Sequence, residues 1–389
     1  MKGIERQYLR ECIEALGKAR ASLVRLSCEE AVSKSIYGKG DSLYLDAAPE
    51  LSIIETLAEF DPHLQLITEE ICSSVKLRDS EDEVVYFSDP MDRSKVLAQF
   101  LKDRTGIVGE VFALKQTVSE WEEANGGNVE LSGPYGSITA IRHHSLLFNV
   151  MINFITGTIY VASDAGLGRL SITNIYEIDE AGVPHLKRTN HLLRHLERIE
   201  FGHTMKDKKT FLTFCEGAKY EDNLISSGIF DKVSKETILE QFLMQSNPGG
   251  PARILYLQTP PACSFILANG EKIGEWLGWL AFVKYSGSTL RAFEISFDKT
   301  WTRDQILMAP GPAYSILVND LKDDMGKPFV NVRLNMSKLK FLENPSRYRS
   351  TLLICPESNA DIIMKMRIQK RVELRFDDKD SEQTQKGTK

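Results

Sequence analysis

The sequence predicts an α/β protein in which N-terminal helices cover a sheet built from strands that are adjacent in the chain. Apolar residues recur at helical spacing over residues 4–34, and again over a helix that begins near Asp46 and ends at Phe60. Three later segments are almost continuously apolar and are separated by short turns: residues 137–142, 146–154 and 157–162. Such segments are typical of strands covered on both faces, so we expect a layered structure.

Two shorter strands are expected between the N-terminal helices and these three segments. Leu64–Thr68 is a short apolar run that stops at two glutamates. Val84–Ser88 is rich in residues that favour strands, and it stops at Asp89 and Pro90, where proline cannot continue a strand ladder. A helix is expected next, over residues 94–104. Both short strands therefore end in acidic residues.

Further helices and strands are predicted in the C-terminal part of the chain. The predicted strands are residues 210–214, 253–257, 281–285, 290–297 and 351–355. The predicted helices are residues 235–245, 270–281, 302–317 and 358–368. We expect an N-terminal α/β half, residues 1–165, and a C-terminal α/β half, residues 166–370. Residues 371–389 are charged and polar, which predicts a disordered tail.

Composition argues against several classes of protein. The 389 residues carry a formal net charge of −6, whereas a general nucleic-acid binder is usually basic. The six cysteines are scattered and form no CxxC pair, which indicates reduced thiols. The N-terminal segment lacks the apolar core of a signal peptide, and no apolar run is long enough to cross a bilayer. We therefore expect a cytoplasmic protein that binds neither nucleic acid nor membrane.

The turn after the strand at 84–88 carries the residues of greatest chemical interest. It reads Asp89, Pro90, Met91, Asp92, Arg93, Ser94 and Lys95. Two carboxylates placed side by side are costly unless a positive charge lies between them. A divalent cation is one candidate, and oxygen ligands suit magnesium or manganese. The alternative is a solvated turn in which Asp92 pairs with Arg93 or Lys95.

These acids would meet Glu69 if the two short strands are neighbours in the sheet. Glu69, Asp89 and Asp92 would then form an oxygen cage for one or two divalent ions, with the Met91 carbonyl as a further ligand. A two-metal oxygen site suits phosphoryl transfer to water, because the metals clamp the phosphate and generate hydroxide.

A second pair of residues could activate the attacking water. Asp46 and Glu50 lie one helical turn apart at the start of a predicted helix. Asp46 could orient the Ser94 hydroxyl, which would then accept a proton from the water.

These residues resemble a known family. The superfamily of inositol monophosphatase, fructose-1,6-bisphosphatase and the 3'(2'),5'-bisphosphate nucleotidases has a Gly-Glu-Glu strand end, followed by Asp-Pro-(Ile/Leu/Val)-Asp-Gly-(Thr/Ser). The corresponding residues here are Thr68-Glu69-Glu70 and Asp89-Pro90-Met91-Asp92-Arg93-Ser94. Phe154 to Tyr160 is similar to the family segment that ends in Gly-x-x-Tyr, and residues 351–355 resemble its closing strand. The resemblance covers about residues 5–370.

The resemblance implies a layered αβαβα sugar-phosphatase-like fold with a mixed, largely antiparallel sheet in the N-terminal half. It implies that Mg²⁺, or Mn²⁺ in its place, is held by Glu69, Asp89, Asp92 and the Met91 carbonyl. Asp46 and Ser94 would be the activating pair.

The function implied is hydrolysis of a small phosphomonoester. In this family the substrates are inositol phosphates, sugar bisphosphates and nucleotide bisphosphates, and dimers or tetramers are common. The partner we expect is therefore a small phosphorylated metabolite, and a homodimer is consistent with the family. A second hypothesis is a catalytically impaired homologue that binds a ligand or a partner protein.

The sequence departs from the family pattern in three places, and two of them, at Arg93 and at the late acid, support this second hypothesis. Arg93 replaces the glycine that lets the backbone approach the phosphate. Arg93 and Lys95 could instead grip phosphate as substrate-binding residues, or Arg93 could pair with the carboxylates in place of a metal. Thr68 replaces the glycine before the two glutamates. The family's late metal-binding acid has no clean equivalent, and Asp304 is the candidate in the first turn of the helix predicted at 302–317.

Overall fold

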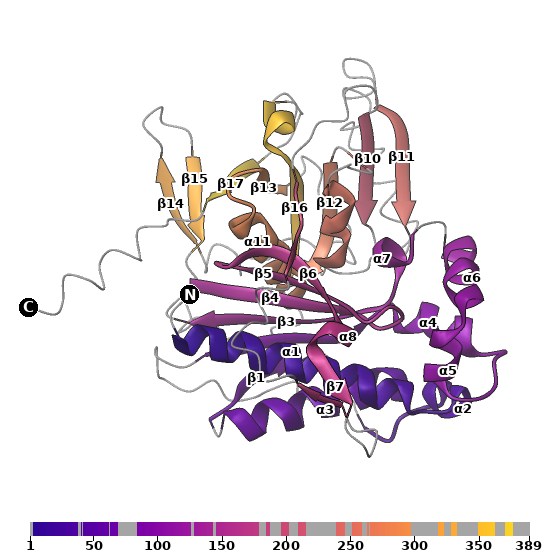
Figure 1. The fold of residues 1–389 in the computed structure, drawn as a ribbon. Coiled ribbons are helices and arrows are strands. Elements are labelled where there is room, and N and C mark those ends of the chain that lie inside the picture. Colours follow the sequence, from indigo (N-terminus) through magenta and orange to yellow (C-terminus); the bar gives the residue numbers. More distant parts are fainter. Residues whose placement is uncertain are drawn as a thin grey trace, which may run out of the picture.

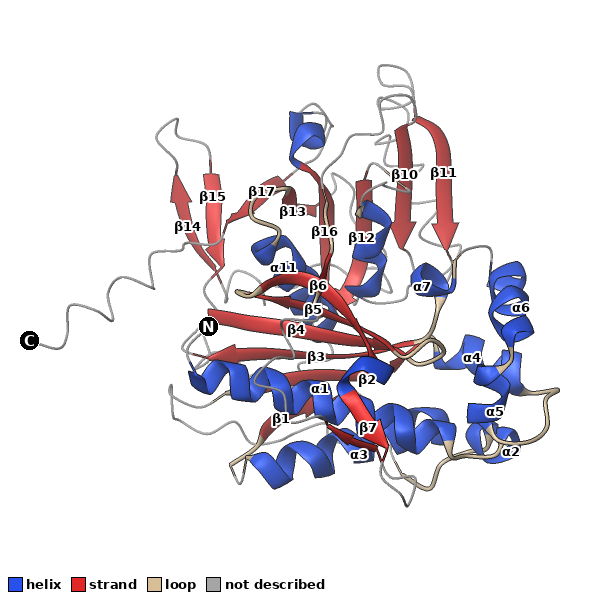
Figure 2. Cartoon of the chain, in the orientation of Figure 1, coloured by secondary structure: helices blue, strands red, loops and turns tan. Residues whose placement is uncertain are grey.

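The structure is a computed structural model, in which the chain is described over most of its length. The described residues are 3–37, 40, 42–61, 63–68, 84–125, 128–142, 145–178, 184–186, 196–201, 209–214, 239–245, 251–258, 263, 265–296, 318–322, 328–332, 349–361 and 370–375. Helices and strands alternate in layers through these residues (Figures 1 and 2).

The N-terminal helical region consists of two helices instead of the single helix predicted over 4–34. Helix α1 is Gly3–Val24 and helix α2 is Cys28–Val32. The break occurs at Ser27, whose side chain accepts a hydrogen bond from the Glu30 N–H while the Glu30 carboxylate accepts one from the Ser27 N–H. This reciprocal capping box starts a new helix and therefore divides the predicted one.

Helix α3, Tyr44–Phe60, packs against α1. The carboxylate of Asp46 accepts a hydrogen bond of 3.2 Å from the Leu43 N–H, which caps the helix. The predicted start of this helix near Asp46 is confirmed. Two helices thus form the outer layer on one face of the first sheet.

The first sheet contains both short strands that the sequence predicts. Its strand order among the described residues is β1-β2-β3-β4-β5-β6-β9. The strands are β1 Gln65–Thr68, β2 Val85–Asp92, β3 Tyr135–Arg142, β4 Ser145–Asn153, β5 Thr158–Ser163, β6 Gly166–Ser171 and β9 Glu197–Arg198. Strand β1 is parallel to β2, and each remaining pair is antiparallel. The predicted mixed, largely antiparallel sheet is confirmed.

Both faces of the first sheet are buried, as the continuous apolar strands predict. On β2, Val85 and Phe87 belong to one core while Tyr86 belongs to another. The core that contains Tyr86 is shared with α1. The core that contains Val85 and Phe87 is shared with helix α11, Ile273–Tyr285. Successive side chains of a strand point to opposite faces, so one strand serves both cores.

A second sheet lies beyond α11. Its order among the described residues is β11-β10-β12-β16-β13-β17-β15-β14. The strands are β10 Lys209–Phe214, β11 Leu239–Gln245, β12 Phe265–Lys272, β13 Leu290–Ser296, β14 Val318–Lys322, β15 Pro328–Val332, β16 Arg349–Pro356 and β17 Lys370–Arg375. Figure 1 shows α11 between the two sheets, and α11 contacts strands of both.

The remaining elements are short. They are α4 Ser94–Leu101, α5 Val108–Ala113, α6 Lys115–Asn125, α7 Val129–Ser132, α8 Ile172–Ile175, β7 Tyr176–Ile178, β8 Pro184–Leu186, η2 Pro251–Leu257 and η4 Glu357–Asn359. The order of helices, sheet, helices and sheet confirms the layered α/β class. The helix predicted at 302–317 and most of that at 358–368 lie outside the described residues. The first sheet continues past residue 165 to Arg198, and the domain limits remain a prediction.

Four local predictions for the C-terminal part are wrong. The predicted helix at 235–245 contains strand β11, because pairing with β10 outweighs the helical preference of its residues. The predicted strand at 253–257 is the 3₁₀ helix η2. The predicted strand at 281–285 continues α11. Residues 371–375, assigned to a disordered tail, belong to β17, which pairs with β13 and β15, while 376–389 lie outside the described residues.

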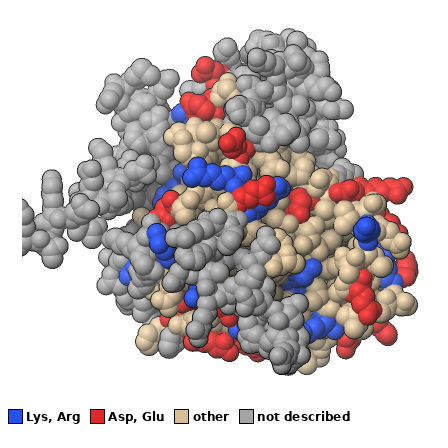
Figure 3. Space-filling view, in the orientation of Figure 1, with Lys and Arg blue, Asp and Glu red and all other residues tan. Residues whose placement is uncertain are grey.

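Charged side chains on the described surface are of mixed sign. Figure 3 shows acidic and basic groups interspersed over the described part of one face. Arg169 and Glu197 form one such pair, with 2.6 Å between Nη2 and Oε1. Within the described residues, no helix is long and apolar enough to cross a membrane. Cys12, Cys28, Cys263 and Cys355 are buried and free, as predicted for reduced thiols.

The packing of α11 gives a stability prediction. A Cβ on Gly278 would lie 2.4 Å from Cγ of Pro251 and 3.1 Å from Nδ2 of Asn149, whereas a Cβ on Gly274 would lie 3.8 Å from Cβ of Phe87. We expect Gly278→Ala to lower the free energy of unfolding by about 1–3 kcal/mol, since overpacking a tight core strains it. The matched control Gly274→Ala should leave it unchanged or raise it. Urea unfolding measures both, and equal effects would contradict the prediction.

A buried carboxyl on α1 gives a pH prediction. Burial raises the pKa of Glu11 above 4.5, its ordinary value. The folded state therefore holds the proton more tightly than the unfolded state, and stability falls as the pH rises through that value. As the pH rises from about 4 to about 7, we expect the free energy of unfolding of Glu11→Gln to fall less than that of the wild type. Denaturant unfolding across this range tests it, with the exposed Glu123→Gln as the control. Parallel curves for all three proteins would refute the prediction.

Candidate functional site

The candidate site lies where β1 and β2 end. These two strands are parallel, and their register pairs Thr68 with Ser88. Thr68 precedes Glu69 in the chain, and Ser88 precedes Asp89. The two short strands are therefore neighbours, which is the condition under which Glu69 would meet Asp89 and Asp92. Glu69 itself lies outside the described residues.

Strand β2 contains a bulge between the two aspartates. Asp89 pairs with Ser137 and Asp92 pairs with Tyr135, so β2 has one residue more than β3 over this interval. A Cβ on Gly136 of β3 would lie only 2.8 Å from the carbonyl oxygen of Pro90, so β3 needs glycine beside the bulge. The bulge thus ends the regular ladder at the acidic residues.

The side chains of this turn differ in their surroundings. Asp89 is buried, with 9% of its surface exposed, and Asp92 is partly exposed. Val85 and Phe87 belong to the core shared with α11, so alternation places Asp89 on that same face. Met91 is buried in the core shared with α1. The two carboxylates therefore lie at the sheet edge, where burial decreases toward Asp92.

Helix α3 approaches the same edge from the other face. Its residue Glu50 is fully buried and accepts a short hydrogen bond from the Thr68 hydroxyl. Asp46 lies one turn earlier in α3, and Ser94 is the first residue of α4. Helices α3 and α4 contact each other. The structure thus brings the elements that carry Asp46 and Ser94 together.

Arg93 retains the backbone conformation that a glycine would favour. Its φ of 66° and ψ of 27° lie in the left-handed region. Its guanidinium donates hydrogen bonds to the Ser132 carbonyl and, at 3.2 Å, to Oδ1 of Asn125. It lies 5.7 Å from the ring centroid of Trp121. The side chain therefore extends from the turn to α6 and α7.

The electrostatic environment of Arg93 is unusual. Burial, followed by the positive charge of Arg253 on η2, lowers its pKa to about 10. The carboxylate of Asp92 acts in the opposite direction on the same pKa. Asp92 therefore lies within electrostatic reach of Arg93, although the hydrogen bonds of Arg93 go to α6 and α7.

Ser94 and Lys95 begin α4 at the solvent boundary. Ser94 is partly exposed and Lys95 is exposed. The first N–H groups of a helix favour anions. Both residues are therefore accessible to a dissolved anion. Arg93, the residue before Ser94 in the chain, is buried.

The structure reveals one further carboxylate that the sequence reasoning did not select. Glu275 lies in the first turn of α11 and is partly buried. The neighbouring Gly274 lies against Phe87 of β2, two residues before Asp89. The signal in the sequence is an acid near the start of the apolar helix predicted at 270–281. Asp304, the predicted late acid, lies outside the described residues.

A complete metal cluster is not formed by the described residues alone. Among them, no group of three His, Cys, Asp or Glu side chains is placed to hold a metal ion. Two predicted ligands, Glu69 and Asp304, are outside this part of the chain. The predicted metal set therefore stays a prediction.

Comparison with known proteins gives structural similarities alone. No family model matches the chain, and no curated protein matches it. An IMPase of Thermotoga maritima aligns with a TM-score of 0.46 and 11% identity, over 92% of this chain and 96% of its own. Inositol monophosphatase II of Staphylococcus aureus gives 0.49 and 10%, over 93% and 92%. CysQ of Bacteroides thetaiotaomicron, a bacterial member of the inositol monophosphatase family, gives 0.48 and 11%, over 90% and 97%.

The left-handed backbone of Arg93 gives a testable prediction. A side chain in this conformation costs about 1–2 kcal/mol relative to glycine. Arg93→Ala and Arg93→Gly both remove the hydrogen bonds to α6 and α7, but only glycine relieves the backbone. We therefore expect Arg93→Gly to be more stable than Arg93→Ala by about 1 kcal/mol in urea unfolding. Ser288→Gly, at φ 71° in an exposed turn, is the control and should gain stability. Equal stability of the two Arg93 variants would contradict this reading of the turn.

Proposed function

We propose that the protein hydrolyses a small phosphomonoester with the help of divalent cations bound at the carboxyl ends of β1 and β2. The observation that carries the proposal is the parallel register of these strands. It pairs the residue before Glu69 with the residue before Asp89, at an edge that also contains Asp92. Acidic side chains from neighbouring strand ends favour binding of a cation.

The donor set suits magnesium or manganese. Asp89, Asp92 and the Met91 carbonyl are oxygen donors on one bulged segment, and Glu69 would complete the set. Glu275 offers a further carboxylate from α11. Burial of Asp89 makes its negative charge costly, which favours a cation beside it. A bound magnesium ion would supply positive charge that polarises the phosphate and lowers the pKa of a bound water.

The chain's own residues would orient the substrate and move the proton. The Asp46 carboxylate would hold the Ser94 hydroxyl so that Ser94 accepts a proton from the attacking water. The first N–H groups of α4 would face the phosphate oxygens. Lys95, exposed at the same helix start, would attract the anionic substrate.

One observation favours the second candidate, a homologue that binds a phosphorylated ligand without hydrolysing it. Arg93 places a buried cation next to Asp92, and its charge would oppose a metal ion there. The two candidates differ in whether divalent cations bind and in whether phosphate is released.

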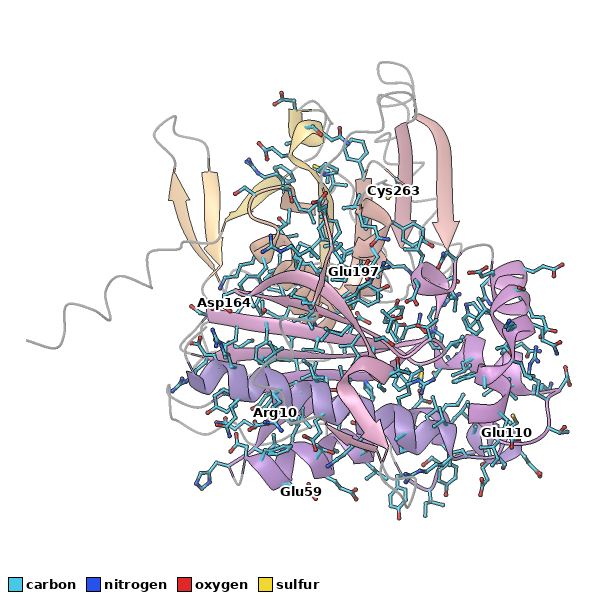
Figure 4. All side chains as sticks on the ribbon, in the orientation of Figure 1. Arg10, Glu59, Glu110, Asp164, Glu197 and Cys263 are labelled. Carbon is cyan, nitrogen blue, oxygen red and sulfur yellow. The ribbon has the colours of Figure 1, made fainter. Side chains whose placement is uncertain are left out.

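Release of inorganic phosphate tests the catalytic proposal. The purified protein would be assayed with Mg²⁺ on inositol monophosphates, sugar bisphosphates and nucleotide bisphosphates. We expect Asp89→Asn to lower the rate at least about 100-fold, since even the outer partners of a metal site contribute about 10–100-fold. Asp164→Asn is the matched control, because Asp164 is exposed in the β5–β6 turn, at the other end of the sheet from α4 and α7 (Figure 4).

Two outcomes would oppose the catalytic proposal. Surviving activity in Asp89→Asn would mean that the site is elsewhere. Inactivity on all substrates, together with no binding of Mn²⁺ in calorimetry, would reject hydrolysis and leave the ligand-binding candidate.

A further inference from the structure

Glu130 of α7 gathers hydrogen bonds from two strands of the first sheet. Its Oε1 accepts one from the Thr158 hydroxyl at 2.8 Å, and its Oε2 accepts one from the Tyr160 hydroxyl at 3.0 Å. The Tyr135 hydroxyl donates to the carbonyl oxygen of Glu130 at 2.6 Å and lies 3.4 Å from Oε2. Hydrogen bonds to an ionised carboxylate are stronger than those between neutral groups. One residue therefore attaches α7 to both β3 and β5.

Tyr135 links Glu130 to the acidic end of β2. Tyr135 is the first residue of β3, and it pairs with Asp92 after the bulge. On its other side it pairs with Asn153 of β4, whose side-chain amide donates to the Val129 carbonyl of α7 at 2.9 Å. The position of Asp92 in the sheet thus depends on a residue that is buried and whose hydroxyl is bonded to Glu130.

Ser132 gives a second link from α7 to the same turn. It is the last residue of α7, and its carbonyl accepts a hydrogen bond from the Arg93 guanidinium. Arg93 lies between Asp92 and Ser94 in the chain, in a left-handed conformation that is costly for a residue with a side chain. The contact at α7 offsets this cost and so helps to hold the turn. A shift of α7 would release the Arg93 side chain.

The two links act on different parts of the turn. The link through Tyr135 acts on the backbone of Asp92, and the link through Ser132 acts on the side chain of Arg93. Both links begin at α7, which the Glu130 carboxylate attaches to β5. A change confined to this carboxylate should therefore reach both Asp92 and Arg93.

We propose that Glu130 is a positioning residue for the turn from Asp92 to Ser94. Its carboxylate holds hydroxyl groups of the protein and acts on the candidate site through other residues. It would thereby set the distance between Asp92 and Asp89 and the direction of the first N–H groups of α4. The inference rests on the proposed function for one consequence, namely that the positioned carboxylates bind a cation. The hold on the turn itself does not depend on a ligand.

Hydrogen exchange on the full chain measures the turn without a ligand. The N–H groups of Val96 and Leu97 donate to the Arg93 carbonyl at 3.1 and 3.0 Å, so their protection reports on the turn. We expect Glu130→Ala to raise their exchange rates about tenfold or more, because it removes two charge-assisted hydrogen bonds. The Lys102 N–H at the end of α4 should exchange as in the wild type. Faster exchange of α7 without faster exchange of Val96 and Leu97 would reduce Glu130 to an anchor of α7 and overturn the proposal.

Two tyrosine variants form a matched pair, since each loses one hydroxyl. Tyr160→Phe removes a hydrogen bond to Glu130, whereas Tyr285→Phe removes one to the Leu146 carbonyl, at 3.0 Å. Leu146 lies near the first residue of β4, whereas Tyr135 pairs with the last, so the two hydroxyls act at opposite ends of the sheet. We expect Tyr160→Phe to speed the exchange of the two N–H groups in the first turn of α4, and Tyr285→Phe to leave it unchanged. Equal rates in both variants would overturn the proposal, even if Glu130→Ala fails to fold.

Calorimetry with Mn²⁺ tests the consequence for the candidate site. We expect Glu130→Ala to bind Mn²⁺ about 10–100-fold more weakly than the wild type, which is the range for outer partners of a metal site. Tyr285→Phe should bind it as the wild type does. Equal Mn²⁺ affinity in Glu130→Ala and the wild type would overturn the positioning role. Faster exchange at the turn in Glu130→Ala, with no Mn²⁺ bound by the wild type, would support the positioning role and reject the cation site of the proposed function.

Discussion

The parallel pairing of β1 with β2 is the constraint on which the candidate site depends. The other described strand pairs of the first sheet are antiparallel, so the carboxyl ends of neighbouring strands there point in opposite directions. The two strands of a parallel pair end at the same side of the sheet, so Thr68, the residue before Glu69, lies beside Ser88, the residue before Asp89. The bulge at Asp89 to Asp92 then stops the ladder with β3, so the backbone at this edge is free to turn into α4.

Much of this edge could be predicted from the sequence, because its signals are local. An apolar run that ends in acids identifies β1, and Pro90 marks the end of the regular ladder in β2. Signals that depend on distant residues could not be read. The Arg93 side chain takes its path from Ser132 and Asn125, and α11 is apolar all round because it lies between two sheets, so periodicity failed over 281–285. Glu275 was not selected for the same reason, since it lies in this uniformly apolar helix.

Helix α7 is short, yet it connects several parts of the structure. The carboxylate of Glu130 accepts hydrogen bonds from the hydroxyls of Thr158 and Tyr160, at 2.8 and 3.0 Å, which attach α7 to β5 of the first sheet. Its carbonyls at Leu131 and Ser132 accept from the two arginines. A helix of one turn has little stability of its own. These side chains therefore fix the position of α7, and α7 in turn fixes both guanidinium groups.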